Sequence, residues 1–217
     1  MDELKSGDMI ALSGRDLGSL GIQVGSLSLP NIWPLGRLGL AGVHHVAILA
    51  PVFGELVVYE STTGDRPPCL RTGREKPKGV QAHRLGEIFA NGVDVWHYPL
   101  RRELYPHEED RLLVAVEMCM SRGYDYMGAG RSGGGLFMRT LQRLKGSESM
   151  DQIFCAELVM WAWIQAGVAQ NKHAGMNPNW LCRYALRKGI CNKPRRLSLD
   201  AFSHLQMIGP NPGIFAG

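Results

Sequence analysis

The sequence predicts an α+β domain in which a small, mainly antiparallel sheet packs against helices. Two patterns lead to this fold class. The first half of the chain is dense in β-branched and aromatic segments that Gly, Pro and Asp separate, and the pattern becomes helical at Pro106. The chain has 217 residues and is 45% apolar, which is enough for one domain with a sizeable core.

The predicted strands are short and lie between clear turn signals. They cover residues 8–12, 43–50, 55–61, 79–83 and 93–98. The segments 63–68 and 72–78 between them are rich in Gly, Pro and charged residues, so we expect surface loops. Residues 14–42 are rich in Gly, Leu and Ser, and their apolar positions fit neither the period of a helix nor that of a strand. This pattern indicates a helical turn and a long loop.

Two longer helices are predicted in the second half of the chain. The first begins at Pro106, has acidic residues in its first turn and ends near Met120, before Gly123. The second begins at Cys155 and continues to Ile164 as an almost entirely apolar stretch.

Residues 128–151 connect the two helices. Gly128–Gly135 contains five glycines but lacks the Lys of a phosphate-binding P-loop, so we expect a mobile loop near the active site. Residues 136–145 alternate apolar and basic positions as a short amphipathic helix does, and 146–151 supply capping residues for the helix at Cys155.

The formal charge of +4 is unevenly distributed. Residues 171–217 hold seven Lys and Arg against one acid, Asp200. We expect a catalytic-type domain over 1–170 and a basic C-terminal extension, 171–217, that packs on the same domain. Its cations could attract nucleic acid or an anionic wall polymer, but a solvated helix face or a contact with a protein partner is the favoured interpretation, and no module for sequence-specific nucleic acid binding is recognisable.

The chain offers no membrane-spanning candidate, because Glu157 and Gln165 interrupt its longest apolar run before the roughly 18 to 20 residues that a bilayer requires. The opening, Met1–Lys5, lacks the basic start and apolar stretch of a secretory signal. We therefore expect synthesis in the cytoplasm without a signal peptide.

Five cysteines at irregular spacings form no CxxC pair, so the sequence predicts reduced thiols rather than a disulfide framework. No metal or organic cofactor is expected, and Cys182 with Cys191 is a poor metal pair without further ligands. Cys69 reads as an ordinary loop thiol and Cys119 as a small buried hydrophobe. His83, His97, His107, His173 and His204 have no partner pattern, so we expect them on the surface.

Cys155 is the candidate nucleophile, because free N–H groups and the positive end of the dipole at a helix start favour a thiolate. A cysteine nucleophile also needs a base and a polar group that orients the base. His44 or His45 can serve as the base, and Glu60 can orient it. Strand alternation directs the two histidines to opposite faces, so at most one points at Cys155. On these residues alone, the cysteine of an apolar helix is more often a core residue, and Glu60 can equally be an exposed strand-end carboxylate.

Four segments in a fixed order resemble the circularly permuted NlpC/P60 family of papain-like cysteine hydrolases, in particular its YiiX/YebB-like group. The resemblance covers residues 7–168 and adds a weaker match in Val80–Phe89 and in Gly123–Tyr126. The four segments are Gly7-Asp8-Met9-Ile10, His45-Val46-Ala47-Ile48, Tyr59-Glu60-Ser61 and Phe154-Cys155-Ala156-Glu157-Leu158-Val159. Ala156 stands where the family often has Ser, His44 where it has Ser or Thr, and 14–42 has no clear counterpart.

The resemblance implies Cys155 as nucleophile, His45 as base and Glu60 as its orienting partner. Tyr124 or Tyr126 then supplies a second oxyanion donor beside the backbone N–H of Cys155. Family members cleave amide, ester or thioester bonds through an acyl-thioester, and many act on cell-wall peptides. We therefore expect a peptidoglycan amide hydrolase, and since compact members occur in tailed phages, the resemblance is compatible with a virion or lysis role.

Two alternatives remain open at the level of sequence. The first is a structural or assembly protein, such as a virion protein, that keeps the fold and uses its basic extension as an interaction surface without turnover. The second is a lipid or thioester acyl hydrolase, for which the amphipathic segment 136–145 offers a short membrane-contacting helix.

Overall fold

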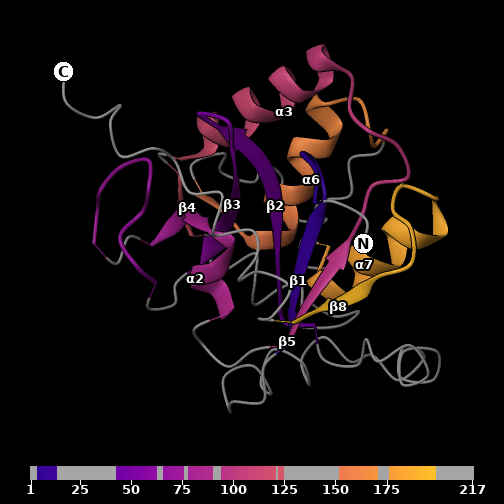
Figure 1. Cartoon of the computed structure of the whole chain (residues 1–217), viewed down its shortest axis with the longest axis horizontal. Coiled ribbons are helices and arrows are strands. Elements are labelled where there is room, and N and C mark those ends of the chain that lie inside the picture. Colours follow the sequence, from indigo (N-terminus) through magenta and orange to yellow (C-terminus); the bar gives the residue numbers. More distant parts are fainter. Residues whose placement is uncertain are drawn as a thin grey trace, which may run out of the picture.

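The computed structural model describes residues 4–13, 43–62, 66–75, 78–89, 94–120, 122–124, 152–170 and 176–198. The predicted segments 14–42, 128–135, 136–145 and 146–151 lie outside this part of the chain. Within it, the architecture is α+β, as the sequence predicts (Figure 1).

An antiparallel sheet of six strands, in the order β4-β3-β2-β1-β5-β8, forms the centre of the described structure (Figure 1). A separate parallel pair is formed by β6 (Gly123–Tyr124) and β7 (Gln152–Ile153). The strands of the large sheet are β1 (Met9–Ser13), β2 (His45–Val52), β3 (Glu55–Thr62), β4 (Gly79–Arg84), β5 (Asp94–Tyr98) and β8 (Arg195–Leu197).

Helices cover both faces of the sheet. On one face, α6 (Cys155–Gln165) packs against β2 and β3, and α3 (Pro106–Cys119) packs against α6. The short helix α2 (Leu85–Phe89) packs on the opposite face, and α7 (Pro178–Arg187) packs against α6 (Figure 1). No helix among the described residues has the length and apolar character needed to cross a bilayer.

Strand alternation divides the apolar side chains of β2 between two cores. Val46 and Ile48 point into the larger core beneath α6, whereas Ala47 and Leu49 point into the smaller core with Ile88 of α2. Both faces of β2 are therefore buried, which explains why its sequence is a continuous apolar run rather than an alternation.

The β2–β3 hairpin closes with a two-residue turn, Phe53-Gly54. Both residues have positive φ, 50° and 83°, and Val52 pairs directly with Glu55. This is the geometry of a type I′ turn, whose twist matches that of the two strands. The turn sets the register that brings the start of β2 beside the end of β3.

Side-chain caps define where the helices begin. Glu108 in α3 and Glu157 in α6 each reach back to the backbone N–H of the residue before the helix, Tyr105 at 2.9 Å and Phe154 at 3.4 Å. In α7 the cap is Asn177, whose side-chain oxygen accepts the N–H of Trp180 at 2.8 Å. Cys155 is consequently the first residue of its helix.

The side chain of Trp163 connects α6 to the chain just before β1. Its side chain is fully buried, and its indole N–H donates to the carbonyl of Gly7 at 2.9 Å, just before β1. Burying a large apolar side chain contributes about 1.5–3 kcal/mol, and the hydrogen bond fixes the rotation of the helix about its axis.

Candidate active site

Cys155 lies where a two-residue strand meets a helix. The preceding strand, β7, pairs with β6, and the hydroxyl of Ser61 in β3 donates to the carbonyl of Ile153 at 2.5 Å. Cys155 is 4% exposed and occupies the first turn of α6, where backbone N–H groups and the helix dipole stabilise an anionic group.

His45 and Glu60 are in direct contact. His45 Nε2 and Glu60 Oε2 are 2.6 Å apart, and the carboxylate is fully buried. The hairpin register, in which Ile48 is opposite Tyr59, makes His45 and Glu60 diagonal neighbours on the same face of the sheet. The reading of Glu60 as an exposed strand-end carboxylate is therefore wrong.

Charges around His45 decide its protonation. Burial disfavours the imidazolium, but the charge of Cys155, hydrogen bonds with Cys155 and Glu60, and the Glu60 charge together raise the pKa of His45 to about 9. Cys155, His45 and Glu60 thus form one interacting group. The neighbouring His44 is half-buried, and its backbone N–H donates to Leu12 O at 3.1 Å.

Glu60 remains ionised despite its burial. Desolvation alone raises the pKa of a buried carboxyl, but the hydrogen bond from His45 and the charges of His45, Arg66 and His83 lower the pKa of Glu60 to about 2. Arg66 Nε is 2.8 Å from Glu60 Oε1 without the alignment of a hydrogen bond, whereas Arg66 Nη2 donates to Oε2 at 3.3 Å. Arg66 therefore acts mainly through its charge.

Two residues of β4 complete the surroundings of Glu60. Gln81 is paired with Glu60 across the strands, and its side-chain oxygen lies 2.9 Å from His83 Nε2. His83 Nε2 is also 3.8 Å from Glu60 Oε1, and burial outweighs the attraction of Glu60 and Glu87, so the pKa of His83 is lowered. His83 is fully buried, and the prediction of a surface residue was wrong.

Sequence reasoning missed Arg66, Gln81 and His83 as members of this cluster. The alternation of β4 carries a signal for two of them, because Gln81 and His83 lie two residues apart and share a face. Arg66 lies in a segment that composition identifies only as a loop, and nothing local indicates that its side chain turns inward to Glu60.

A second buried histidine–carboxylate pair connects β1 to β5. His97 Nε2 is 2.6 Å from Asp8 Oδ2, and His97 Nδ1 accepts a hydrogen bond from Arg195 Nε at 3.1 Å, which places the histidine proton on Nε2. Asp8 also accepts the backbone N–H groups of Leu100 at 2.8 Å and Lys5 at 3.0 Å. Together, Asp8, His97 and Arg195 connect the start of β1 to β5 and β8. His97 is fully buried, and the prediction that it lies on the surface was wrong.

The side chains of the two tyrosines predicted as oxyanion donors lie outside the described residues. The backbone of Tyr124 lies in β6 opposite Ile153, two residues before Cys155, and its side chain lies outside the described residues. Tyr126 lies outside them altogether. Their role stays a prediction.

The arrangement of sheet and helices was compared with known proteins. No family model matches the sequence, and no curated protein matches it significantly. Among solved structures, metalloprotein yiiX from Escherichia coli O157:H7 superposes with a TM-score of 0.50, over 89% of this chain and 96% of that one. In fold, this chain is similar to yiiX. The two sequences are 14% identical, so the likeness extends to the fold alone.

The yiiX protein is described as a metalloprotein, which raises the question of a metal site in this chain. Within the described ranges, no group of three or more His, Cys, Asp or Glu side chains is arranged to hold a metal ion. The Glu60 carboxylate already forms ion pairs with Arg66 and His45. The described donors therefore do not fit a metal centre.

Proposed function

We propose that the protein is a papain-like cysteine hydrolase of the permuted NlpC/P60 kind, with Cys155 as nucleophile, His45 as its proton-transfer partner and Glu60 as the orienting carboxylate. The observation that carries the proposal is the buried 2.6 Å contact between His45 and Glu60, in a cluster where Cys155 also raises the pKa of His45. The fold similarity to yiiX and the His, Glu, Cys order along the chain support it.

In the acylation step, the Cys155 thiolate attacks the carbonyl carbon of the scissile amide and forms the C–S bond. His45, held as imidazolium by Glu60, gives its proton to the departing amine nitrogen as the C–N bond breaks. The fixed Glu60 contact keeps the histidine ring oriented through both proton transfers.

In the deacylation step, neutral His45 takes a proton from a water molecule that attacks the thioester carbonyl. The C–S bond breaks, the acid product leaves and the proton returns the pair to its starting state. Negative charge on the carbonyl oxygen is stabilised by the backbone N–H of Cys155 at the helix start, with Tyr124 or Tyr126 as the proposed second donor.

The proposed substrate is an amide bond of a peptidoglycan peptide, in line with the resemblance to cell-wall hydrolases, and the proposed site of action is the cell wall. We further propose that the basic extension 171–217 serves assembly or delivery, as a phage-associated role requires. Two of its cations already have structural contacts, Arg195 with His97 and Arg196 with Asp94.

One observation favours a second candidate, an assembly protein that keeps the fold without turnover. Cys155 is only 4% exposed, and a nucleophile must admit a carbonyl carbon to its sulfur. The two candidates differ in whether the thiol reacts with a small electrophile in the native protein.

Labelling of the native protein with iodoacetamide, followed by peptide mapping, distinguishes them. We expect Cys155 to react about tenfold faster than the buried Cys119, and the His45→Ala change to remove most of this advantage. Cys119 is a matched internal control, because burial raises the pKa of its thiol and it has no histidine partner in the described structure. Reaction of Cys155 no faster than Cys119 would refute the hydrolase and favour the assembly protein.

A further inference from the structure

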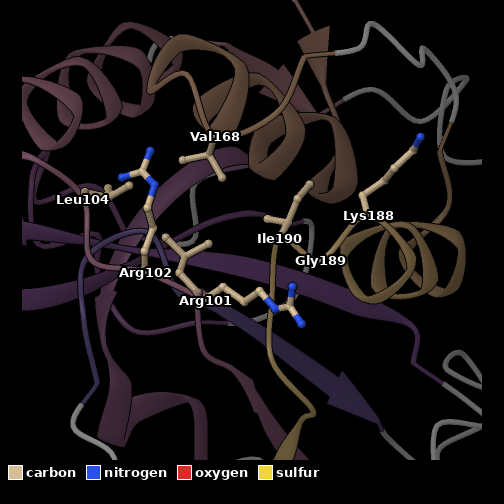
Figure 2. Close-up of a pocket in the computed structure, with 8 residues that line it drawn as sticks. Arg101, Arg102, Leu104, Val168, Lys188, Gly189 and Ile190 are labelled. Atoms are coloured by element: carbon tan, nitrogen blue, oxygen red, sulfur yellow. The ribbon is translucent and has the colours of Figure 1, made fainter.

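A small pocket lies at the opposite end of α6 from Cys155. It has a volume of about 290 Å³ and is formed by the segment after β5, the segment after α6 and the end of α7 (Figure 2). An α-helix rises 1.5 Å per residue, so the 11 residues of α6 separate the pocket from the thiol by about 16 Å. The pocket is distinct from the candidate active site.

Cationic side chains dominate the polar part of this pocket. Arg102 lies on one side, near Val168, and Arg101 extends along the other side below Gly189, with Lys188 at the end of α7 (Figure 2). Among the residues that the structure describes, no acidic side chain lines the pocket. Gly189 has a φ of 66°, and an added Cβ would lie 3.0 Å from Arg101 Nη1, so the glycine makes room for this guanidinium.

Two of the three positive charges are not neutralised by the described residues. Arg102 forms two bonds with the Glu108 carboxylate, at 2.5 and 2.6 Å, which offset its charge. Arg101 and Lys188 are both exposed, and neither forms an ion pair with any residue that the structure describes. The pocket therefore carries about two unbalanced positive charges.

The negative end of α7 does not provide the missing counter-charge. Two carbonyls near its end already accept hydrogen bonds, since the N–H of Ile190 donates to Ala185 O at 2.9 Å and that of Gly189 to Leu186 O at 3.1 Å. The backbone of Arg101 is fixed as well, because its N–H donates to the Ile190 carbonyl at 2.9 Å. The backbone beside the pocket is thus fixed, whereas the exposed Lys188 side chain extends away from Arg101 (Figure 2).

The lining between the cations is apolar and only half-buried. It is made by Leu100, Leu104, Val168 and Ile190. Ligand sites combine such apolar walls with a few polar groups that fix orientation, and typically have volumes of about 300–1,000 Å³. At the lower end of this range, the pocket accommodates one end of a molecule.

We propose that the pocket binds a phosphomonoester group attached to an apolar body. A phosphomonoester carries about two negative charges near neutral pH, which matches Arg101 and Lys188 better than the single charge of a carboxylate. The guanidinium of Arg101 provides paired donors for two phosphate oxygens, and the lysine provides a mobile point charge. The apolar lining takes the first carbons of the attached chain.

Calorimetric titration of the full chain with hexyl phosphate, inorganic phosphate and hexanoate tests the proposal. We expect hexyl phosphate to bind about tenfold more tightly than either of the other two compounds. Inorganic phosphate has no apolar chain for the lining, and hexanoate has only one negative charge for the two cations. The Arg101→Gln/Lys188→Gln double variant should weaken hexyl phosphate binding about tenfold or more. Both side chains are exposed, so the variant retains its fold.

The matched control is the Arg111→Gln/Lys193→Gln variant, which removes the same charge from two exposed positions outside the pocket. Its affinity for hexyl phosphate should stay within about twofold of the unaltered protein. Equal weakening in both double variants, or hexanoate binding as tightly as hexyl phosphate, would overturn the assignment.

Vesicles containing phosphatidic acid distinguish a lipid from a soluble source of the phosphate. Sedimentation with vesicles that the Arg101→Gln/Lys188→Gln change abolishes indicates a lipid headgroup, whereas hexyl phosphate binding without sedimentation indicates a soluble phosphomonoester. If the Arg101→Gln/Lys188→Gln variant still binds vesicles and the unaltered protein does not bind hexyl phosphate, the assignment of the pocket as a phosphomonoester site would be refuted. The titration involves no turnover, so its outcome is independent of the proposed hydrolase.

Discussion

Acidification tests the buried ion cluster around Glu60 directly. The Glu60 pKa is lowered from 4.5 to about 2 in the folded protein, because His45, Arg66 and His83 stabilise its charged form despite complete burial. A carboxyl whose folded pKa is lowered adds stability that is fully present above the unfolded pKa and is lost as the pH falls through the folded pKa. The sensitive range is therefore pH 4.5 to 2.

The size of the effect follows from the shift. The pKa difference of about 2.5 between the unfolded and the folded protein corresponds to roughly 3–4 kcal/mol, at about 1.4 kcal/mol for each pKa unit. According to the linkage relation, about 2 kcal/mol of this contribution is lost between neutral pH and pH 3. The loss occurs because at pH 3 Glu60 is protonated in the unfolded chain and still ionised in the folded chain.

Urea denaturation of the unaltered protein and of Glu60→Gln at pH 7, 5, 4 and 3 measures this loss. The difference in unfolding free energy between the two proteins should shrink by about 2 kcal/mol from pH 7 to pH 3, since the glutamine does not titrate. Glu75→Gln, at an exposed carboxylate, is the control and should show a nearly constant difference. A constant difference for Glu60→Gln would refute the buried, ionised carboxylate.

Two further predictions concern the reaction and the backbone. Hydrolysis should decline as the pH rises through about 9, where imidazolium His45 loses the proton it gives to the leaving group, and a kcat/KM profile with its alkaline limb near 6.5 would contradict the contacts that raise this pKa. Gly79→Ala should destabilise the fold by more than about 2 kcal/mol, because φ is 113° and the new Cβ would lie 2.3 Å from the carbonyl of Arg122. The control Gly73→Ala has a φ of 64° and nothing within 4 Å of the new Cβ, so it should lower the stability by only about 1–2 kcal/mol. Thermal unfolding measures both variants. Equal losses of stability would contradict the close approach of Gly79 to the Arg122 carbonyl.

Local patterns were sufficient for five of the strands and for the two longer helices. The expected strand 55–61 is β3 (Glu55–Thr62), and the expected helix 106–120 is α3 (Pro106–Cys119). Side-chain period, turn residues and caps act within a few residues, so they can be read along the chain. The five-residue α2 and the two-residue strands β6 and β7 were missed, because such short elements have no measurable period.

The helix α7 (Pro178–Arg187) was missed for a different reason. Its start signals, Asn177 as cap and Pro178 in the first turn, are present in the sequence, but the basic composition of 171–217 predicts only a charged extension. The strand β8 is three residues long, and only its pairing with β5 identifies it.

By itself, the sequence determined the local elements and the order in which His45, Glu60 and Cys155 follow one another. Only the tertiary structure decided that Glu60 is buried in contact with His45, that Arg66 supplies the balancing charge, and that His83 and His97 are buried. The physical reason is the range of the interactions. Periodicity and capping operate between near neighbours, whereas strand register, desolvation and charge pairing join residues that are distant in sequence and acquire partners only when the sheet closes.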